Sequence, residues 1–473
     1  MSRFPALLPE AALVLVGLLI FAAMLADRDR EKLSRRAAQA GSVLLLAACV
    51  ASLGATASVF WGSYRVDAFS QLVKTAVAAG FALAVFITRD GAGQRDDARG
   101  ELFFFLLTSA AGLMAMASAM EALALYVALE IASFSLFVLV PLRENFAPGK
   151  EAGIKFVVVG LAASAVTLYG LSLLIGLTGT TRLHAMATSP AVLAGDPTAV
   201  IGIGLFAAGF LFKLALFPFH FWAPDVYEGA SHGVASFVAT ASKVAAVALL
   251  ARLFEVFGPS TVGMAGALAL AAAVSMTLGN LVAMVQRDVK RMLAYSAVAQ
   301  AGYIAVGFVA FTTEGISAAL LYGLLYLLMN AAAFLVVARV GADGTNPSLD
   351  SLRGLHRRSP LLAATLLVAL FALAGVPPTA GFVGKWLLFR AAMDRGWWWL
   401  VLLGAVNSTA SVYYYLVAVK HAYLLPAETE TPVSLTTGDR VMCYGLCTAL
   451  VVLGVHPGPL VDWAERAAQA LLQ

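Results

Sequence analysis

The feature that most constrains the fold of this chain is a succession of apolar runs, each about 20 residues long. A helix of that length crosses the hydrocarbon core of a bilayer, which is about 30 Å thick. Of the 473 residues, 61% are hydrophobic and 12% are charged, against about 25% charged in soluble globular proteins. Alternating strand patterns are absent. We therefore predict an all-α polytopic membrane protein that lies in the lipid bilayer.

The apolar runs predict about fourteen transmembrane helices. The predicted spans are 5–26, 38–62, 66–87, 101–120, 121–142, 152–177, a broken seventh helix around Lys213, 233–256, 262–285, 290–311, 316–340, 360–390, 397–424 and 440–456. The twelfth span is interrupted at Pro377 and Pro378, because proline blocks a continuous helix. We expect the polar stretches 178–198 and 341–359 to be loops, and the tail 460–473 to be a short interfacial helix.

The basic residues are distributed unevenly between the two sets of loops. Of the 31 Lys and Arg residues, 20 fall in loops after odd-numbered spans, 8 fall on the opposite side and 3 lie inside predicted spans. The loop after the seventh span carries none. Short loops rich in Lys and Arg face the cytoplasm. We therefore expect both termini on the non-cytoplasmic side.

Lys213 lies inside an apolar helix, a few residues before a predicted interruption of that helix. The stretch 209–230 reads GFLFKLALFPFHFWAPDVYEGA, with Pro218 five residues after the lysine. A lysine in hydrocarbon costs about 2.5–3.5 kcal/mol on insertion scales, and broken helix at membrane depth is tolerated only within protein or beside water. We predict an ion or proton site here. The alternative is a lysine whose side chain extends to the interface.

Three further charged groups lie within predicted spans. Lys243 lies in TASKVAAVALL, and Lys385 follows the second proline interruption in GVPPTAGFVGKWLLF. Glu130 is the clearest acid in the middle of a span, and an isolated buried carboxylate usually takes up a proton unless a cation partners it. The alternatives are extension to the interface for Lys243, an anchor beside Trp386 for Lys385 and a polar helix contact for Glu130.

Polar side chains that form hydrogen bonds occur along the later spans. They include Asn280, Tyr295, Ser296, Gln300, Tyr322, Tyr326, Asn330, Asn407, Ser408 and Tyr413. Our relay candidates for a proton are His220, His232, Tyr295, Gln300 and Tyr326. Each alone is explained by helix packing. Together with buried lysines, one carboxylate and broken helices, they indicate a hydrated proton wire across the bilayer.

The sequence offers no cofactor chemistry of its own. It lacks a phosphate loop, a Rossmann glycine pattern, a haem motif and an iron–sulfur cysteine set. Its three cysteines, Cys49, Cys443 and Cys447, lie in apolar runs without metal-ligand spacing. We expect no cofactor, no metal and no nucleic acid on this chain, and a driving force supplied by a partner.

Several motifs carry a family resemblance over nearly the whole chain. They are LLPE, YRVDAFSQLVK, ALEIASFSLFVL, KEAGIKF, GLTGTTRL, the stretch around Lys213, QRDVKRMLAYSAVAQAGYI, GVPPTAGFVGKWLLF and VNSTASVYYYL. The chain resembles the subunit N family of bacterial NADH–quinone oxidoreductase, or respiratory complex I. These are antiporter-like, proton-translocating membrane subunits.

The resemblance implies a fold of fourteen helices with two inverted five-helix repeats, in which helices 7 and 12 are broken. It divides the chain into helices 1–3 at residues 1–100, a first repeat at 101–256, a second repeat at 257–424, and helix 14 with the tail at 425–473. It assigns proton translocation to Glu130, Lys213, Lys243 and Lys385. Many relatives have a histidine where this chain has Gln300, and glutamine does not titrate.

The resemblance also implies partners. NADH, FMN, iron–sulfur clusters and quinone would belong to other membrane and peripheral subunits of the complex, in a bacterial inner membrane. The first alternative is a subunit of a monovalent cation/proton antiporter or of a related membrane-bound oxidoreductase. The second is a passive structural spacer, which the buried charges argue against, because a spacer gains nothing from their cost.

Overall fold

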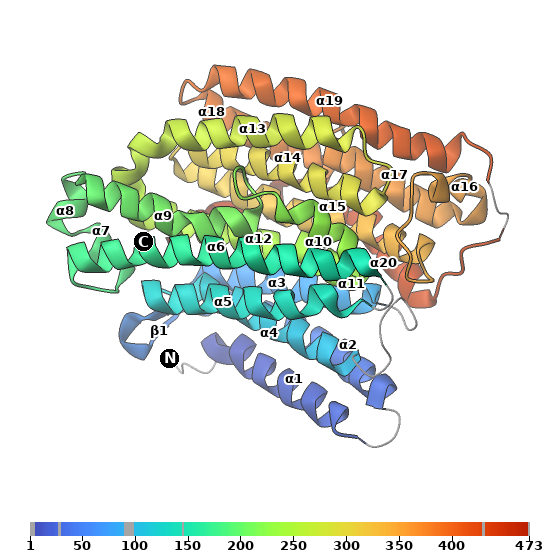
Figure 1. Ribbon diagram of the computed structural model, residues 1–473, viewed down its shortest axis with the longest axis horizontal. Coiled ribbons are helices and arrows are strands. Elements are labelled where there is room, and N and C mark those ends of the chain that lie inside the picture. Colours follow the sequence, from blue (N-terminus) through green and yellow to red (C-terminus); the bar gives the residue numbers. More distant parts are fainter. Residues whose placement is uncertain (1–4, 27–29, 89–98, 144–145, 428–430, 472–473) are drawn as a thin grey trace.

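The computed structural model describes residues 5–26, 30–88, 99–143, 146–427 and 431–471. Figure 1 shows long helices running side by side along one direction, with the described chain beginning and ending at the same end of the bundle. That arrangement requires an even number of crossings, as predicted. Arg3, Arg28, Arg89 and Arg95, which contribute to the charge count, lie outside the described residues.

The long helices follow the predicted spans in order. The first six are α1 (Leu8–Met24), α2 (Arg30–Ala51), α3 (Ala68–Ile87), α4 (Arg99–Ser118), α5 (Ala122–Leu139) and α6 (Ala147–Thr178). Next come α9 (Pro197–Leu214), α10 (Trp222–Gly229), α11 (His232–Ala239), α12 (Ala241–Thr261), α13 (Ala265–Ala283), α14 (Val289–Val309) and α15 (Thr313–Val340). The last are α17 (Pro360–Ala374), α18 (Ala380–Met393), α19 (Trp398–Tyr423), α20 (Thr437–Val455) and α21 (Gly458–Leu471).

Twelve helices of the described chain are long and apolar enough to cross a membrane. The α2 helix adds a crossing whose first turns are charged, and the interrupted pair α17–α18 adds another. These crossings agree with the predicted number of about fourteen. The division into repeats at residues 100, 256 and 424 stays a prediction.

Both predicted helix interruptions are present. The α9 helix ends at Ala215, which adopts the left-handed conformation with φ 58°, and α17 ends at Gly375 with φ 83°. A third interruption was not predicted. The span at 233–256 was expected to be continuous, but Thr240 leaves the helical region (φ −112°, ψ −85°) and separates α11 from α12.

Other boundaries also differ from the prediction. The second span was expected to reach residue 62, but α2 ends at Ala51 and an antiparallel hairpin follows, formed by β1 (Ala57–Val59) and β2 (Tyr64–Val66). The polar stretch 178–198 contains the short helices α7 (Leu183–Ala187) and α8 (Pro190–Leu193). The stretch 341–359 contains a 3₁₀ turn (Asp350–Leu352) and α16 (Leu355–Arg358).

Of the remaining short turns, Pro5–Leu7, Val140–Leu142 and Val262–Met264 lie at the ends of long helices, and Phe60–Gly62 lies between β1 and β2. The predicted tail helix is present as α21. It buries Ala464, Ala467, Ala468 and Leu471 on one face, because apolar residues three and four apart lie on one side of a helix.

The most buried helices lie in the middle of the bundle. The most apolar 18-residue windows of the span 232–258 and of α14 are 100% and 94% buried, against 28% for the first span and 22% for α20. The outer helices therefore present apolar side chains to lipid. Lys213, Lys243 and Lys385 are buried within the bundle, whereas Glu130 is only partly buried on α5.

Candidate functional site

The broken end of α9 carries Lys213 and is completed by Lys243. An α-helix leaves its last carbonyl groups without partners. At the end of α9, the indole nitrogen of Trp222 donates to the Phe212 carbonyl at 3.0 Å. The Lys243 ammonium, from α12, donates to the carbonyl of Leu214, the last residue of α9. A lysine cation at a helix C-terminus is also favoured by the helix dipole.

Lys213 and Glu130 lie near one another but are held by different serines. The Lys213 ammonium, on a side chain that is 3% exposed, donates to the Ser133 hydroxyl at 3.2 Å. The Ser164 hydroxyl donates to the Glu130 carboxylate at 2.5 Å. Within the described chain, Glu130 and Lys213 form no ion pair of 4.0 Å or less. The two side chains are therefore separated from one another in this structure.

A small cavity lies beside the carboxylate. Glu130, Ser133 and Ser164 line a space of about 10 Å³ together with side chains of α6 and α9. That volume is close to the minimum for one water molecule, which also needs polar partners. The two serines and the carboxylate supply such partners. The cavity thus has room for about one water molecule beside Glu130.

Lys385 holds the second interrupted helix in the same way. Its ammonium donates to the carbonyls of Leu373 and Ala374 at 3.0 Å each, and to the Ser408 hydroxyl at 3.0 Å. Leu373 and Ala374 are the last residues of α17. The ammonium also lies 4.4 Å from the ring centroid of Tyr303, a favourable cation–π geometry. By its contacts, Lys385 corresponds to Lys243, because each donates to the end of a broken helix.

Gln300 is joined to the Lys385 site through a shared acceptor. Its amide nitrogen donates to the Leu373 carbonyl at 2.9 Å, the same oxygen that accepts from Lys385. The Tyr322 hydroxyl donates to the Gln300 amide oxygen. Gln300 is 1% exposed. Its amide therefore bridges the end of α17 and the hydroxyl of α15 inside the bundle.

Further hydroxyl and amide groups extend this network. The Tyr415 hydroxyl lies 2.5 Å from the Ser296 hydroxyl and 3.5 Å from the Gln300 amide nitrogen. The Asn280 amide donates to the Tyr303 hydroxyl at 3.2 Å. The result is a continuous polar region around Lys385, built from α13, α14, α15 and α19. Sequence reasoning had named Asn280 and Ser296 only as scattered polar residues.

The other four relay candidates lie elsewhere. The His220 ring packs against Phe221 in the α9–α10 connection, with centroids 4.2 Å apart. The His232 ring nitrogen Nε2 lies 3.1 Å from the Gly341 carbonyl. The Tyr326 hydroxyl is buried without a hydrogen bond, and Tyr295 lies half-buried under Arg291. Of the five candidates, Gln300 alone shares an acceptor with a site lysine in the part of the chain that the structure describes.

Sequence analysis missed a buried ion pair near the N-terminus. Lys74 was counted with the loops, but its side chain is fully buried, and its ammonium lies 2.6 Å from the Glu10 carboxylate. The Tyr64 hydroxyl donates to the same carboxylate at 2.6 Å. These residues come from LLPE and YRVDAFSQLVK, two motifs that carried the family resemblance. The motifs therefore pointed to these residues, but the sequence did not show that Lys74 pairs with Glu10.

A second missed cluster binds the end of α10. Lys290 and Arg143 were also assigned to loops, and both are buried. Each donates to the carbonyl of Glu228 at 3.1 Å, and Lys290 donates to that of Ala230 at 2.5 Å. Both also reach the side-chain oxygen of Asn346. The described chain thus buries five lysines, not three, because Lys74 and Lys290 join the predicted ones.

A third missed contact is the buried pair of Arg339 and Asp439. The Arg339 guanidinium lies 2.7 Å from the Asp439 carboxylate, with side-chain exposures of 1% and 3%. Arg339 also donates to the carbonyls of Phe86 and Ile87, the last residues of α3 before its cap. This pair connects α3, α15 and α20. The pair holds these three helices together at one end of the bundle.

The arrangement does not offer a metal site in the described residues, where no group of three or more His, Cys, Asp or Glu side chains is placed to hold one ion. The polar groups of the site are lysine ammonium groups, one carboxylate, hydroxyl groups and amides.

Comparison with known proteins identifies relatives over the full length. The sequence matches the family described as "NADH:quinone oxidoreductase/Mrp antiporter, TM" over residues 119–411. NADH-quinone oxidoreductase subunit N 2 of Solidesulfovibrio magneticus is 44% identical over 474 residues, which cover 100% of both chains. A chain of respiratory complex I from Thermus thermophilus, solved with bound aureothin, is 34% identical, with a TM-score of 0.83 over 97% of this chain and 98% of that one.

The fold alone does not separate the oxidoreductase from the antiporter. A chain of the Mrp complex from Dietzia sp. DQ12-45-1b has a TM-score of 0.88 over 100% of both chains, at 21% identity. The full-length identity to subunit N makes the distinction. The resemblance expected from the motifs is therefore confirmed, and the chain belongs to the subunit N family of NADH–quinone oxidoreductases, within the wider NADH:quinone oxidoreductase/Mrp antiporter family.

Proposed function

We propose that this chain is a proton-translocating membrane subunit of a NADH–quinone oxidoreductase, and that Glu130, Lys213, Lys243 and Lys385 carry the protons. One observation supports this most directly. At each of the two predicted interruptions the helix is followed by a left-handed residue, and a buried lysine donates to the last carbonyl group of that helix. Ionisable groups within membrane spans are costly and typically mark ion or proton sites, and two such sites occur in the described chain.

The first half of the path begins at Glu130 and Lys213. Two unit charges about 4 Å apart attract by roughly 4 kcal/mol at an effective dielectric constant of about 20. Approach of the carboxylate therefore holds a proton on Lys213, and separation favours its release. The serine contacts describe the separated state. Lys243 donates to the residue next to Lys213, so it is the proposed acceptor of the released proton.

The second half of the path centres on Lys385. Its hydrogen bonds reach the Gln300 amide through the Leu373 carbonyl. Gln300 does not titrate, so its proposed role is to orient the neighbouring hydroxyl groups and water. We assign residues 101–256 and 257–424 to two repeats, since each contains one of the two predicted interruptions, after α9 and after α17.

The driving force comes from partner subunits. We propose that NADH, FMN, iron–sulfur clusters and quinone are bound by other subunits of the complex, in a bacterial inner membrane. This chain then converts a conformational or charge change relayed along the membrane subunits into proton movement. A cation/proton antiporter would need no such partners.

The test is purification of the intact membrane complex through a tag on this chain. We expect co-purification of flavin- and iron–sulfur-containing subunits, and quinone reduction with NADH as the electron donor. Recovery of a complex that lacks flavin and iron–sulfur clusters but exchanges monovalent cations for protons would contradict the assignment.

A further inference from the structure

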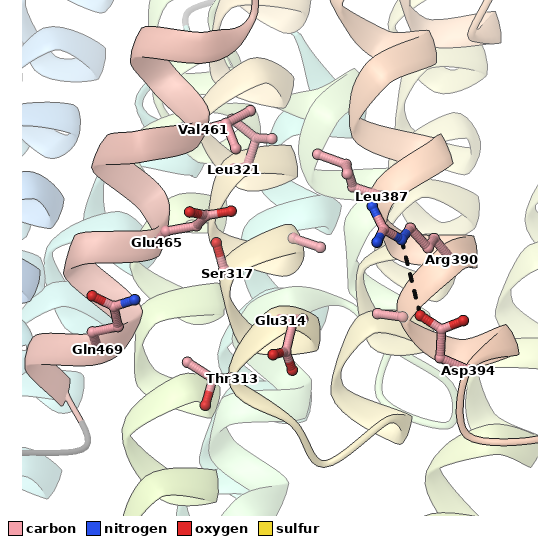
Figure 2. Close-up of a pocket in the computed structure, with 12 residues that line it drawn as sticks. Thr313, Glu314, Ser317, Leu321, Leu387, Arg390, Asp394, Val461, Glu465 and Gln469 are labelled. Carbon is pink, nitrogen blue, oxygen red and sulfur yellow. Dashed lines mark ion pairs between the residues drawn. The ribbon is translucent and has the colours of Figure 1, made fainter.

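A cavity of about 300 Å³ lies between α15, α18 and α21, away from the buried lysines. Figure 2 shows side chains from all three helices surrounding it. The volume lies at the lower end of the range for small-molecule sites. The lining residues are Thr313, Glu314, Ser317, Ala318, Leu321, Leu387, Arg390, Ala391, Asp394, Val461, Glu465 and Gln469.

The lining changes from apolar to charged along the helix axis. Thr313 begins α15, and Leu321 lies eight residues further along, a rise of about 12 Å. In Figure 2, Leu321, Leu387 and Val461 lie together at one end of the cavity, and Glu314 and Asp394 lie at the other. Headgroup regions extend roughly 5–7 Å beyond each face of the hydrocarbon core. The lining of the cavity therefore changes from apolar to charged in the same way that a bilayer changes from hydrocarbon to headgroups.

The charged end of the cavity carries both positive and negative side chains. Glu314 and Glu465 form no ion pair within the described residues, and Arg390 lies 3.9 Å from Asp394. A cation suits the two free carboxylates, and a phosphate suits the guanidinium. No single ion satisfies both. A ligand with an ammonium group and a phosphate group does.

Ser317 adds an independent sign of a ligand. Its side chain lines the cavity, is 6% exposed and forms no hydrogen bond in the described part of the chain. Figure 2 shows its oxygen on the side of Glu465. Because this hydroxyl opens into the cavity, an occupant can reach it. The cavity thus presents one hydroxyl group, two exposed carboxylates and an exposed guanidinium to one occupant.

We propose that this cavity binds the head group of a phospholipid that carries both an ammonium and a phosphate, namely phosphatidylethanolamine. The ammonium donates its three N–H groups towards Glu314, Glu465 and Ser317. The phosphate accepts from Arg390, and the glycerol region contacts Leu321, Leu387 and Val461. The lipid joins α21 to α15 and α18.

The position of the site gives it a consequence for the proton path. Arg390 lies on α18 with Lys385, five residues away, and Leu321 precedes Tyr322, the hydrogen-bond donor to Gln300. A bound lipid therefore fixes the two helices that carry these groups. We expect loss of the lipid to loosen the Lys385 site without removing any of its residues.

The experiment uses the intact complex in phosphatidylcholine vesicles that contain a trace of photoactivatable phosphatidylethanolamine. The readout is the labelling of peptides from α18 and α21. The double variant Glu314→Gln/Glu465→Gln should lower this labelling by about tenfold, since each charged hydrogen bond is strong. Asp462→Asn removes one charge from the same helix but does not line the cavity, and should leave labelling unchanged.

Competition identifies the ligand. Unlabelled phosphatidylethanolamine should abolish the labelling, whereas more phosphatidylcholine or soluble glycerophosphoethanolamine should not. Equal labelling of the double variant, or equal competition by phosphatidylcholine, would show an ordinary boundary lipid and overturn the proposal. Competition by the soluble compound alone would assign the cavity to a free small molecule. Absence of labelling in the intact complex would mean that a neighbouring subunit fills it. Both results would also overturn the proposal.

Discussion

The Lys385 ammonium lies 3.0 Å from the Leu373 carbonyl oxygen, at the end of the helix that precedes its own. In the proposed path this lysine has two roles, because it would carry a proton and it also satisfies a helix end. Lys243 has the same two roles at Leu214. Variants at these positions therefore need controls that separate an effect on proton transfer from an effect on folding.

Tyr322→Phe should slow proton translocation, since it removes the donor to Gln300 and leaves a buried amide oxygen without its partner. An unsatisfied buried group costs about 1–3 kcal/mol, so the thermal stability of the complex should fall modestly. Tyr413→Phe is the matched control, because Tyr413 is 61% exposed. Equal proton uptake by the Tyr322 variant and wild type in vesicles would show that this hydroxyl has no part in the path.

Ser133→Ala should alter turnover because it removes the acceptor that holds Lys213 away from Glu130. Ser135→Ala is its control. Ser135 lies on the same helix and is also buried, but its hydroxyl bonds only to the backbone, at the Ile131 carbonyl. We expect quinone-reductase activity to change in the first variant only. The same activity in both variants would remove Ser133 from the account.

Glu130→Gln and Lys213→Met should each slow turnover, and the double variant should be no worse than the poorer single one. Groups that serve one shared function give non-additive effects. The measurements are quinone reduction and proton uptake in membranes, corrected for the amount of assembled complex. Strictly additive losses would contradict a paired switch.

Arg339→Met should destabilise the protein strongly. It leaves Asp439 buried without its cation and two α3 carbonyl groups without donors, and breaking a buried pair costs about 3–5 kcal/mol. Arg440→Met is the control, because Arg440 follows Asp439 on the same helix and is exposed, and surface substitutions usually change stability by no more than about 0.5 kcal/mol. The amount of assembled complex on native gels measures the difference. Equal amounts of assembled complex in the two variants would mean that the buried pair does not hold these helices together.

Sequence reasoning located the spans and both proline interruptions because apolar run length and proline act locally. It also identified Lys213, Lys243 and Lys385 as residues within spans. It did not detect the break at Thr240, where the sequence TASKVAAVALL contains neither glycine nor proline. That break depends on packing and not on local propensity.

The missed contacts share a physical reason. Lys74 lies in the second turn of α3, close enough to a helix end to be read as interfacial, and its partner Glu10 lies 64 positions earlier in the chain. Arg339 and Asp439 are 100 positions apart. The depth of a charge near a helix end is set by which helix packs against it. Which helices pack together cannot be read from a single sequence.

The most direct test of proton translocation by this chain is the rate of proton uptake during quinone reduction in vesicles of the intact complex that carry Lys385→Ala, Lys385→Arg or the exposed control Lys150→Ala. The account predicts that Lys385→Ala lowers translocation by on the order of 10²-fold, the low end for loss of a positioned proton-transfer group, with the assembled complex retained. Lys385→Arg should not restore it, because arginine does not release its proton, and Lys150→Ala should match wild type. Wild-type proton uptake in Lys385→Arg would contradict the account, since it would show that no proton leaves this position during turnover.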